Sequence, residues 1–406
     1  MSGVISNSSS SFTQPIQYFS NTWTEAHNLF LAAYTDFKKA HPMAECLLQE
    51  LDAKGASGET LSITGVYLPP KRRSQKNLVI INSGIHGAEA AAGSASLIKL
   101  LRSLTDGSLE VPPTTGVFMV HIMNPYGFSH RREENGLQYG AIRVNSHGVD
   151  LNRNFKYITN APSQSIKEGV NSFINPEETS GFAGFMWNLG KCIRNEGKDG
   201  LQKAMLNGQY DNPNGCLFGG GGLEQESQIV IDWVKPFMEA FKTTSIIDLH
   251  TGYFSSNAYS TMPLSGDVEA ARTLFSQTHS NFGDALSQDE DSKGRTFVEG
   301  LAYQVVQCGK KVGLGVVVEY TPGLVEDNES FTGIKFQASM LKTLQLTIKE
   351  NHVRTHETPP IEKAEVTKEY ETIFETFDDA WKDQVVNAAK EIFRKVFSYN
   401  QKTSPD

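Results

Sequence analysis

The chain has 406 residues, of which 39% are hydrophobic and 10% aromatic, enough for a large buried core and too many for a disordered protein. Its formal net charge is -9 and it has no long basic run, which argues against nucleic acid or an anionic membrane surface as the main partner. The four cysteines are scattered, the start lacks the pattern of a secretory signal, and no apolar run approaches about 20 residues, so we expect a cytoplasmic protein without membrane helices.

The first half of the chain alternates helical and strand patterns. Residues 1–13 are rich in Ser and Asn and predict a disordered start, and "TWTEAHNLFLAAYTDFKKA" predicts a helix that opens with a capping box at Thr22 and Glu25. "LSITGVYL" has the pattern of a strand, and "NLVIINSG" (77–84) is a short apolar run typical of a strand covered on both faces. That apolar pattern returns at 116–124, 243–250 and 312–320, and helical stretches lie between these runs, at 90–104 and 224–242. The alternation predicts an α/β protein with a mostly parallel sheet.

The last part of the chain has a different pattern. "FGGGGLEQES" (218–227) lacks the Gly-Lys-Ser/Thr ending of a phosphate loop, so we interpret it as a flexible loop before a helix. "THETPPIEKAE" interrupts the pattern, and an amphipathic stripe from Tyr370 to Val396 then predicts a helix that packs on the main domain, with a partner-binding helix as the alternative. We therefore divide the chain into a disordered start (1–13), a catalytic domain (14–350), and a linker with a C-terminal helix (351–406).

Histidine and glutamate side chains, which can bind metal ions, lie at the ends of three predicted strands. His86 and Glu89 follow the first buried strand, His250 ends "SIIDLH", and Glu319 ends "GVVVE". The carboxyl ends of parallel strands gather at one edge of the sheet, where ligands bind. Two imidazoles and one carboxylate supply three zinc ligands and leave a fourth position open to water, while a second glutamate can act as general base. Gly84 and Gly87 let the backbone approach closely at the first corner.

Each of these residues also has an ordinary structural explanation. A His-x-x-Glu pair is common by chance, and a histidine at a strand end is often held by a simple hydrogen bond. Glu319 is harder to explain in this way, because a carboxylate at the end of a buried strand is costly without a partner. The four residues together favour a site.

The stretch "GVDLNRNF" (148–155) completes a family pattern. With it, the sequence resembles the zinc carboxypeptidase superfamily, the carboxypeptidase A-like metallopeptidases, whose known zinc ligands are two histidines and a glutamate. The matching pieces stand in family order: "GIHGAE", "NPYGF", "GVDLNRNF", "DLHTG" and "VVVEYTPG". The opening "YFSNTWTEAHNLFLAAYTDF" and "NGQYDNPNGCLFGGG" resemble an uncharacterised branch, a domain of unknown function, and this likeness spans roughly residues 17 to 345.

The resemblance implies roles for single residues. It makes His86, Glu89 and His250 the ligands of one zinc ion per chain, Glu319 the general base and proton shuttle, and Asp150 the carboxylate that orients His86.

It further implies that Asn152 and Arg153 hold a substrate's terminal carboxylate, a role that suits a guanidinium fork, although a capped turn with a solvated arginine is the structural alternative. The family's oxyanion arginine lies upstream of this motif. Arg143 is in the better register, with Arg131 and Arg132 as alternatives.

The resemblance also implies the architecture and the reaction. We expect a three-layer α/β/α domain with a twisted, mixed, mostly parallel sheet of eight strands, a count taken from the resemblance, and a C-terminal helical extension. The family's mobile tyrosine has no assured match, and Tyr303 and Tyr253 are weak candidates.

We expect a zinc-dependent hydrolase that cleaves an amide bond in a peptide or acyl-amino acid with a free carboxylate. A deacylase of the aspartoacylase or succinylglutamate desuccinylase kind is the alternative, and the helical tail favours the peptidase. A third hypothesis is a non-catalytic binding protein of the same fold. The substrate's identity, the position of cleavage and the oligomeric state stay open.

Overall fold

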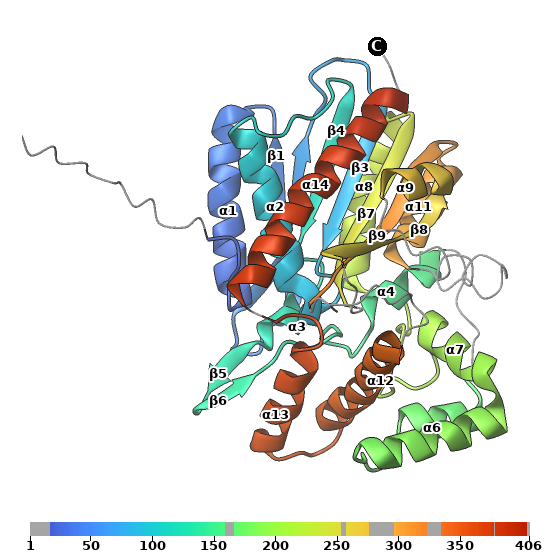
Figure 1. Cartoon of the computed structure of the whole chain (residues 1–406). Coiled ribbons are helices and arrows are strands. Elements are labelled where there is room, and N and C mark those ends of the chain that lie inside the picture. The colour runs from blue at the N-terminus through green and yellow to red at the C-terminus, as the bar shows by residue number, and fades with distance from the viewer. Residues whose placement is uncertain are drawn as a thin grey trace, which may run out of the picture.

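A single mixed sheet of seven strands forms the centre of the protein (Figure 1). The computed structural model describes residues 17–158, 166–252, 257–275, 296–322, 334–376 and 378–403, so the start predicted to be disordered lies outside the described residues. The strands follow the order β1-β2-β4-β3-β7-β9-β8. Their bounds are β1 Glu45–Lys54, β2 Thr60–Leu68, β3 Asn77–Ser83, β4 Thr115–His121, β7 Thr243–Thr251, β8 Tyr259–Gly266 and β9 Lys311–Tyr320.

The sheet differs in one respect from the expected architecture. The expectation of eight strands is wrong, since seven strands pair in this sheet within the described residues. The two other strands, β5 (Arg132–Glu134) and β6 (Leu137–Tyr139), form a separate antiparallel hairpin. They are short and largely solvent-facing, so they lack the apolar faces that a strand in the central sheet must bury. The expected α/β class and mixed sheet are confirmed: β4, β3, β7 and β9 are parallel, and the flanking pairs are antiparallel.

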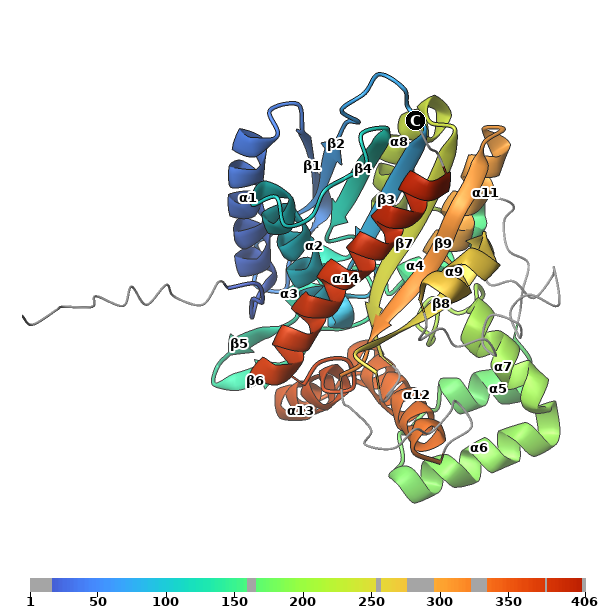
Figure 2. The ribbon, with the colours of Figure 1, turned by 45° about the horizontal axis from the view of Figure 1, so that its top comes forward.

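The alternation of side chains along the central strands builds two helical layers. Along β3, Val79 and Ile81 join the core under α1 (Trp23–Ala40), α2 (Ala90–Thr105) and α14 (Asp379–Thr403). Leu78 and Ile80 point to the other face, where the core includes α8 (Gln225–Ala240) and α11 (Phe297–Gln307). Because successive side chains of a strand point to opposite faces, a continuous apolar run is buried on both sides. Figures 1 and 2 show α1, α2 and α14 together on one face.

A group of helices lies beyond the carboxyl ends of the parallel strands (Figures 1 and 2). Part of this group has a small apolar core of its own, to which Phe173, Phe185 and Ile348 contribute. The helices at this end are α4 Leu151–Asn154, α5 Glu168–Ile174, α6 Phe182–Glu196, α7 Lys198–Asn207, α12 Ile334–Thr355 and α13 Pro360–Glu371, and α9 Val268–Leu274 lies beside β8. The end of α12 and all of α13 therefore occupy much of the segment expected to be a linker.

The C-terminal helix α14 packs back on the main sheet. Its stripe, which includes Val385, Ile392 and Val396, is buried in the same core as α2. Nε1 of Trp381 donates to the carbonyl of Thr321, just after β9, at 2.9 Å. The helix therefore spans the sheet rather than presenting its apolar face to solvent.

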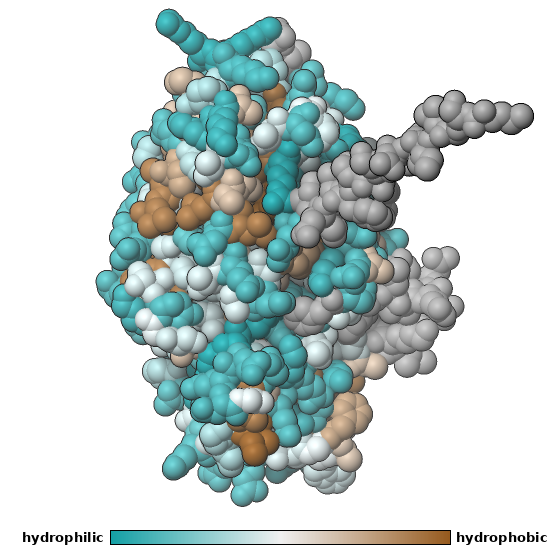
Figure 3. Space-filling view, turned by 90° about the vertical axis from the view of Figure 1, so that its left-hand side faces the viewer, coloured by the Kyte–Doolittle hydropathy of each residue, from teal (hydrophilic) through white to brown (hydrophobic). Residues whose placement is uncertain are grey.

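The surface is mixed in character. Figure 3 shows a mostly hydrophilic face on which apolar side chains gather in separate patches. Within the described part of the chain, no helix combines the length and apolar character needed to cross a membrane.

Candidate metal centre

Two neighbouring parallel strands position the three predicted zinc ligands. His86 follows β3 and precedes a short 3-10 turn, Gly87–Glu89, which leads directly into α2. His250 lies in β7, the parallel neighbour of β3. One nitrogen of each histidine and one oxygen of Glu89 lie within 4.8 Å of one another, and all three side chains are buried. The structure brings the three residues together at one point.

Close backbone packing makes the first corner possible. Gly84 has a positive φ of 63°, and a Cβ atom there would lie 2.4 Å from Cγ2 of Ile122. A Cβ atom at Gly87 would lie 2.2 Å from the backbone of Gly127, in the helical turn α3 (Pro125–Ser129). A side chain at either position would displace the turn that presents His86 and Glu89. The expectation that glycine lets the backbone pack closely at this corner is therefore confirmed.

Each histidine lies between two carboxylates. Nδ1 of His86 is 2.8 Å from Oε1 of Glu89, and Nδ1 of His250 is 2.8 Å from Oε2 of the same side chain. On the other side, Nε2 of His86 is 3.2 Å from Asp150, and Nε2 of His250 is 2.9 Å from Asp248. A neutral imidazole has only one N–H, so a ring that donates to its aspartate turns a lone pair toward Glu89. Two lone pairs and one carboxylate then converge, which is the donor set of a zinc site.

The surrounding charges also fit a divalent cation. Four buried carboxylates and two guanidinium groups surround this point: Glu89, Asp150, Asp248 and Glu319, with Arg143 and Arg153. With Glu319 protonated and the other three carboxylates ionised, one negative charge exceeds the positive ones. Buried charge is stable only when it is offset, and a cation with two positive charges at the histidines would offset it.

Asp150 links His86 to the arginine side of the site. It precedes α4, and its Oδ1 accepts from the backbone N–H of Asn152 at 3.0 Å. Nε of Arg143 donates to its Oδ2 at 2.9 Å. Burial alone would raise the pKa of Asp150, but the charges of Arg143 and Arg153 and the hydrogen bond with His86 hold this pKa well below its usual value. Asp150 therefore stays ionised beside His86, which is the arrangement that an orienting carboxylate needs.

Glu319 stands beside His250 on the neighbouring strand. The two residues are paired in the register of β7 with β9. Burial raises the pKa of the Glu319 carboxyl to about 8, with Glu89 acting in the same direction and His250 in the opposite one. A carboxyl group poised near neutral pH suits proton transfer.

The structure separates the three candidate arginines. Arg143 lines the cavity that holds the histidines, and its Nη1 lies 3.6 Å from Oε1 of Glu89. Arg131 binds two glutamates of the C-terminal region, and Arg132 pairs with Glu134 of the β5–β6 hairpin at 2.8 Å. The position of Arg143 is the one compatible with a role in the site.

The chain as a whole matches one family model. The model of the DUF2817 family, described as a protein of unknown function, matches residues 19–388. The chain belongs to the DUF2817 family. No curated protein matches it.

Several solved structures resemble this DUF2817 protein at low identity. Bovine thrombin-activatable fibrinolysis inhibitor, in complex with tick carboxypeptidase inhibitor, is 12% identical with a TM-score of 0.43, covering 95% of this chain and 98% of its own. A metallo-carboxypeptidase from Burkholderia cenocepacia is 16% identical with a TM-score of 0.43, and the match covers 84% of this chain and 72% of that protein. A Shewanella frigidimarina protein, provisionally assigned as a succinylglutamate desuccinylase/aspartoacylase, is 14% identical with a TM-score of 0.34. The match covers 81% of this chain and 71% of that protein. Metallocarboxypeptidases and the deacylase group thus both occur among the structural neighbours.

In this family member, Arg153 and Asn152 line the same cavity as the histidines. Nη2 of Arg153 donates to the carbonyl of Met205, in α7, at 3.2 Å, and its buried Nε has no hydrogen-bond partner among the described residues. No carboxylate of the described residues forms an ion pair with Arg153, so its charge can meet an anionic ligand. Oδ1 of Asn152 accepts from the backbone N–H of Phe297 at 2.9 Å, which ties this loop to the start of α11.

Several residues at the site were missed from the sequence. Asp248 contacts His250. The sequence could have indicated this contact, because residues two apart on a strand share a face. Ile373 and Phe374 line the cavity from the segment after α13; Ile373 belongs to the predicted amphipathic stripe, and no local pattern assigned either residue to the site. Of the two tyrosine candidates, Tyr303 lies in α11 and does not line the cavity, and Tyr253 lies outside the described residues.

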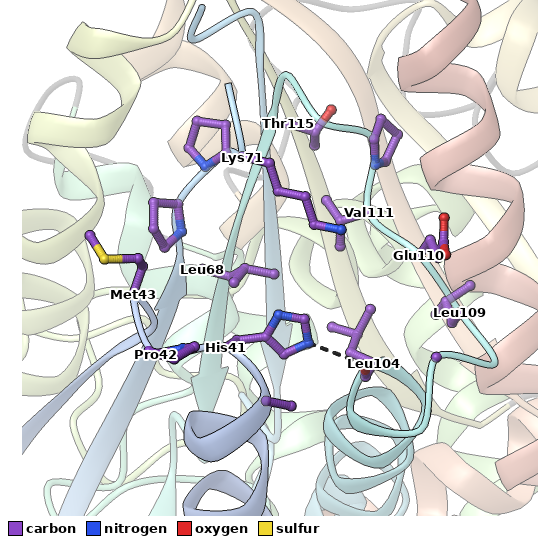
Figure 4. Close-up of a pocket in the computed structure, with 15 residues that line it drawn as sticks. His41, Pro42, Met43, Leu68, Lys71, Leu104, Leu109, Glu110, Val111 and Thr115 are labelled. Atoms are coloured by element: carbon purple, nitrogen blue, oxygen red, sulfur yellow. Dashed lines mark hydrogen bonds between the residues drawn. The ribbon is translucent and has the colours of Figure 1, made fainter. Parts of the chain in front are cut away.

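A second, larger cavity lies at the opposite edge of the sheet, where β4 begins (Figure 4). Its volume is about 520 Å³, and Leu68, Lys71 and Thr115 contribute to its lining. Nε2 of its one histidine, His41, lies 3.1 Å from the carbonyl of Leu104. The cluster of possible metal ligands among the described residues lies in the other cavity, at the carboxyl ends of the strands.

Proposed function

We propose that this DUF2817 protein is a zinc-dependent hydrolase that cleaves an amide bond in a peptide or acyl-amino acid with a free carboxylate. One observation carries the proposal: His86, Glu89 and His250 converge in a buried cavity that also holds Glu319 and two arginines. Metal ligands, a proton acceptor and anion-binding groups are the parts that metal-assisted amide hydrolysis requires.

The residues divide the work of hydrolysis. His86, Glu89 and His250 would hold the zinc ion, which when bound polarises the carbonyl and lowers the pKa of water. Glu319 accepts the proton of the attacking water and returns it to the leaving amine, for which a raised pKa is suited.

The arginines act at the two ends of the reacting group. Arg143 donates to the carbonyl oxygen as negative charge develops there. Burial alone would lower its pKa, but the charges of Asp150 and Glu89 raise it, so Arg143 keeps its proton throughout. Arg153 binds the carboxylate of the substrate, because a guanidinium fork offers two parallel donors.

A deacylase of the aspartoacylase or succinylglutamate desuccinylase kind is the second candidate. The small cavity, about 140 Å³, favours it. The C-terminal region favours the peptidase, since its described residues from 334 onward form helices and no strand.

Metal analysis and a substrate screen together test the proposal. We expect about one zinc ion per purified wild-type chain, and loss of tight zinc binding in His250→Ala, measured by elemental analysis. The matched control is His147→Ala, which removes an exposed histidine that pairs with Glu224 outside the cavity. Stoichiometric zinc in His250→Ala would contradict the metal site. A zinc-loaded wild-type protein that cleaves no member of a library of acyl-amino acids and peptides would contradict the hydrolase.

A further inference from the structure

The C-terminal region completes the wall of the candidate active site. Ile373 and Phe374 line the cavity together with the predicted metal ligands, and their exposed fractions are 5% and 4%. They follow α13 in a tight turn, in which the backbone N–H of Phe374 donates to the carbonyl of Glu371 at 2.9 Å. The ring of Phe374 packs on Tyr370 with the centroids 5.1 Å apart. We call residues 371–375 the cavity wall.

A buried ion-pair network fixes this wall. Glu371 and Glu375 stand on either side of Ile373 and Phe374, and both carboxylates bind the guanidinium of Arg131. All three charged residues are buried. Nη2 of Arg131 donates to Glu375 at 2.7 Å, and Nε donates to Glu371. A planar guanidinium that binds two carboxylates at once restrains both, so the two apolar residues between them have little freedom to move.

The wall is also tied to the loop that carries Arg143. Oε1 of Glu371 accepts from the backbone N–H of Ala141 at 2.9 Å, and Oγ1 of Thr367 accepts from that of Gly140 at 3.2 Å. A Cβ atom at Gly140 would lie 2.2 Å from the carbonyl oxygen of Thr367, so α13 and this loop touch backbone to backbone. The wall therefore has a fixed place relative to the predicted oxyanion arginine.

The wall and the carboxylate anchor reach the cavity from different elements. Arg153 is held at α7, whereas the wall follows α13, and in Figures 1 and 2 α12 lies between these two helices. If Arg153 holds the carboxylate and the metal site holds the reacting carbonyl, the acyl group must occupy what remains of the cavity. Much of that remaining surface is apolar: Met262, Leu264, Val317, Ile373 and Phe374.

The cavity is small for a hydrolase of long peptides. The space bounded by the described residues is about 140 Å³. Pockets that enclose drug-sized ligands typically measure about 300–1,000 Å³. A fixed wall in so small a space limits how far a substrate can extend beyond the reacting carbonyl.

We propose that the cavity wall, held by Arg131, limits the acyl side of the substrate, so that this protein hydrolyses short acyl-amino acids and dipeptides and excludes long acyl chains and longer peptides. The inference rests on the proposed function and names its substrate class. Arg131 is a positioning residue here, since it contacts the wall and not the substrate.

Shortening the wall side chains tests the proposal through a ratio. We would measure kcat/KM for N-acetyl-alanine and N-dodecanoyl-alanine in the wild type, Phe374→Ala and Ile373→Ala. We expect the wild type to favour the acetyl substrate, and each variant to raise the dodecanoyl-to-acetyl ratio by about tenfold or more, because a few methylenes decide acceptance in a small apolar pocket. Ile361→Ala is the control: its side chain is on α13 and 60% exposed, and the ratio should not change. A wild type that cleaves both substrates equally, or an unchanged ratio in both wall variants, would overturn the proposal.

A binding measurement separates the wall from the chemistry. Acetohydroxamic and dodecanohydroxamic acids bind zinc sites without being hydrolysed and share the same chelating group, so the ratio of their dissociation constants reports the effect of the wall. If no amide is cleaved but the wall variants gain affinity for the long hydroxamate, the proposed function is refuted and the role of the wall in limiting the ligand is supported. If amides are cleaved and the ratio of dissociation constants is the same in all variants, the role of the wall is refuted and the proposed function is supported. If no hydroxamate binds the zinc-loaded wild type, both fail.

Two milder variants cover the case in which the alanine variants do not fold. Phe374→Leu keeps an apolar side chain while shortening the wall. Arg131→Lys keeps the charge but loses the planar fork that reaches two carboxylates. Both should raise the dodecanoyl-to-acetyl ratio, whereas a purely structural defect would lower the two values of kcat/KM in parallel.

Discussion

Replacing Asp248 by asparagine tests how the second predicted histidine ligand is held in place. Asp248 is fully buried, and its two oxygens face different donors. Oδ2 lies 2.9 Å from Nε2 of His250, and Oδ1 accepts from Nδ2 of Asn82 at 2.8 Å. Asparagine has nearly the same shape but only one carbonyl oxygen. Whichever way its amide is turned, His250 meets either an N–H group or an uncharged carbonyl oxygen, so the charge-assisted hydrogen bond of His250 is lost.

The expected loss of zinc affinity follows from these contacts. A hydrogen bond to a charged group contributes about 1.5–3 kcal/mol, or roughly a factor of 10–150 in an equilibrium constant. Loss of a group that orients a metal-bound histidine typically costs about 10–100-fold in affinity or activity. The two ranges agree, so we expect Asp248→Asn to bind zinc about 10–100-fold more weakly while keeping its fold.

Competition with a fluorescent zinc chelator of known affinity measures this loss. The matched control is Asp52→Asn, which makes the same change at an exposed position on β1 and should leave zinc affinity within about twofold. Thermal unfolding of the metal-free proteins shows whether the fold is retained. Unchanged affinity in Asp248→Asn, or an equal loss in Asp52→Asn, would refute the orienting role of Asp248.

The remaining predictions concern separate parts of the molecule. Asp150→Asn should weaken zinc binding by a similar 10–100-fold, since Asp150 faces His86 as Asp248 faces His250, and normal affinity and activity would disprove this role. Glu319→Gln should keep stoichiometric zinc while kcat falls by roughly 10²–10⁴-fold, and a near-normal kcat would remove Glu319 as the base. Arg153→Ala should lower kcat/KM about 10–150-fold for an acyl-dipeptide and spare its C-terminal amide, and equal losses on both would remove the carboxylate anchor. Burial holds the pKa of His121 well below its usual value, so the unfolded chain binds a proton that the folded chain does not, and stability falls as pH drops below about 6.5. Urea unfolding at pH 7 and pH 5 should show a smaller fall in His121→Gln than in the wild type, and equal falls would contradict a neutral buried His121.

Much of the site could be predicted because its parts are local. The strand that ends at Ser83 and the helix that begins at Ala90 are both visible as apolar patterns, and these two elements fix His86 and Glu89. His250 and Glu319 end similar apolar runs, and parallel strands bring such ends to one edge of the sheet. Asp248 was open to the same reasoning, since it shares a strand face with His250.

The missed parts depend on contacts between distant segments. Ile373 and Phe374 lie between Glu371 and Glu375, which both bind Arg131, and nothing in the sequence around residue 131 marks those partners. The stripe that begins at Tyr370 was interpreted as part of one long amphipathic helix, whereas the chain forms two helices with the cavity wall between them. The strand count failed for a different reason, because it was taken from the resemblance and not from an apolar run.

The position of α14 has a consequence for how the protein is made. The carbonyl of Asn400 accepts from Nδ2 of Asn77 at 2.9 Å, so a helix synthesised long after β3 closes over the first residue of that strand. Domains form as synthesis proceeds from the amino end, and surfaces that await a late partner stay exposed and prone to aggregation meanwhile. A product that stops before residue 379 would contain every predicted zinc ligand but would leave the apolar face of α2 in water. Termination before α14 should therefore lower the cellular amount of this protein through proteolysis, instead of leaving a stable shortened chain behind.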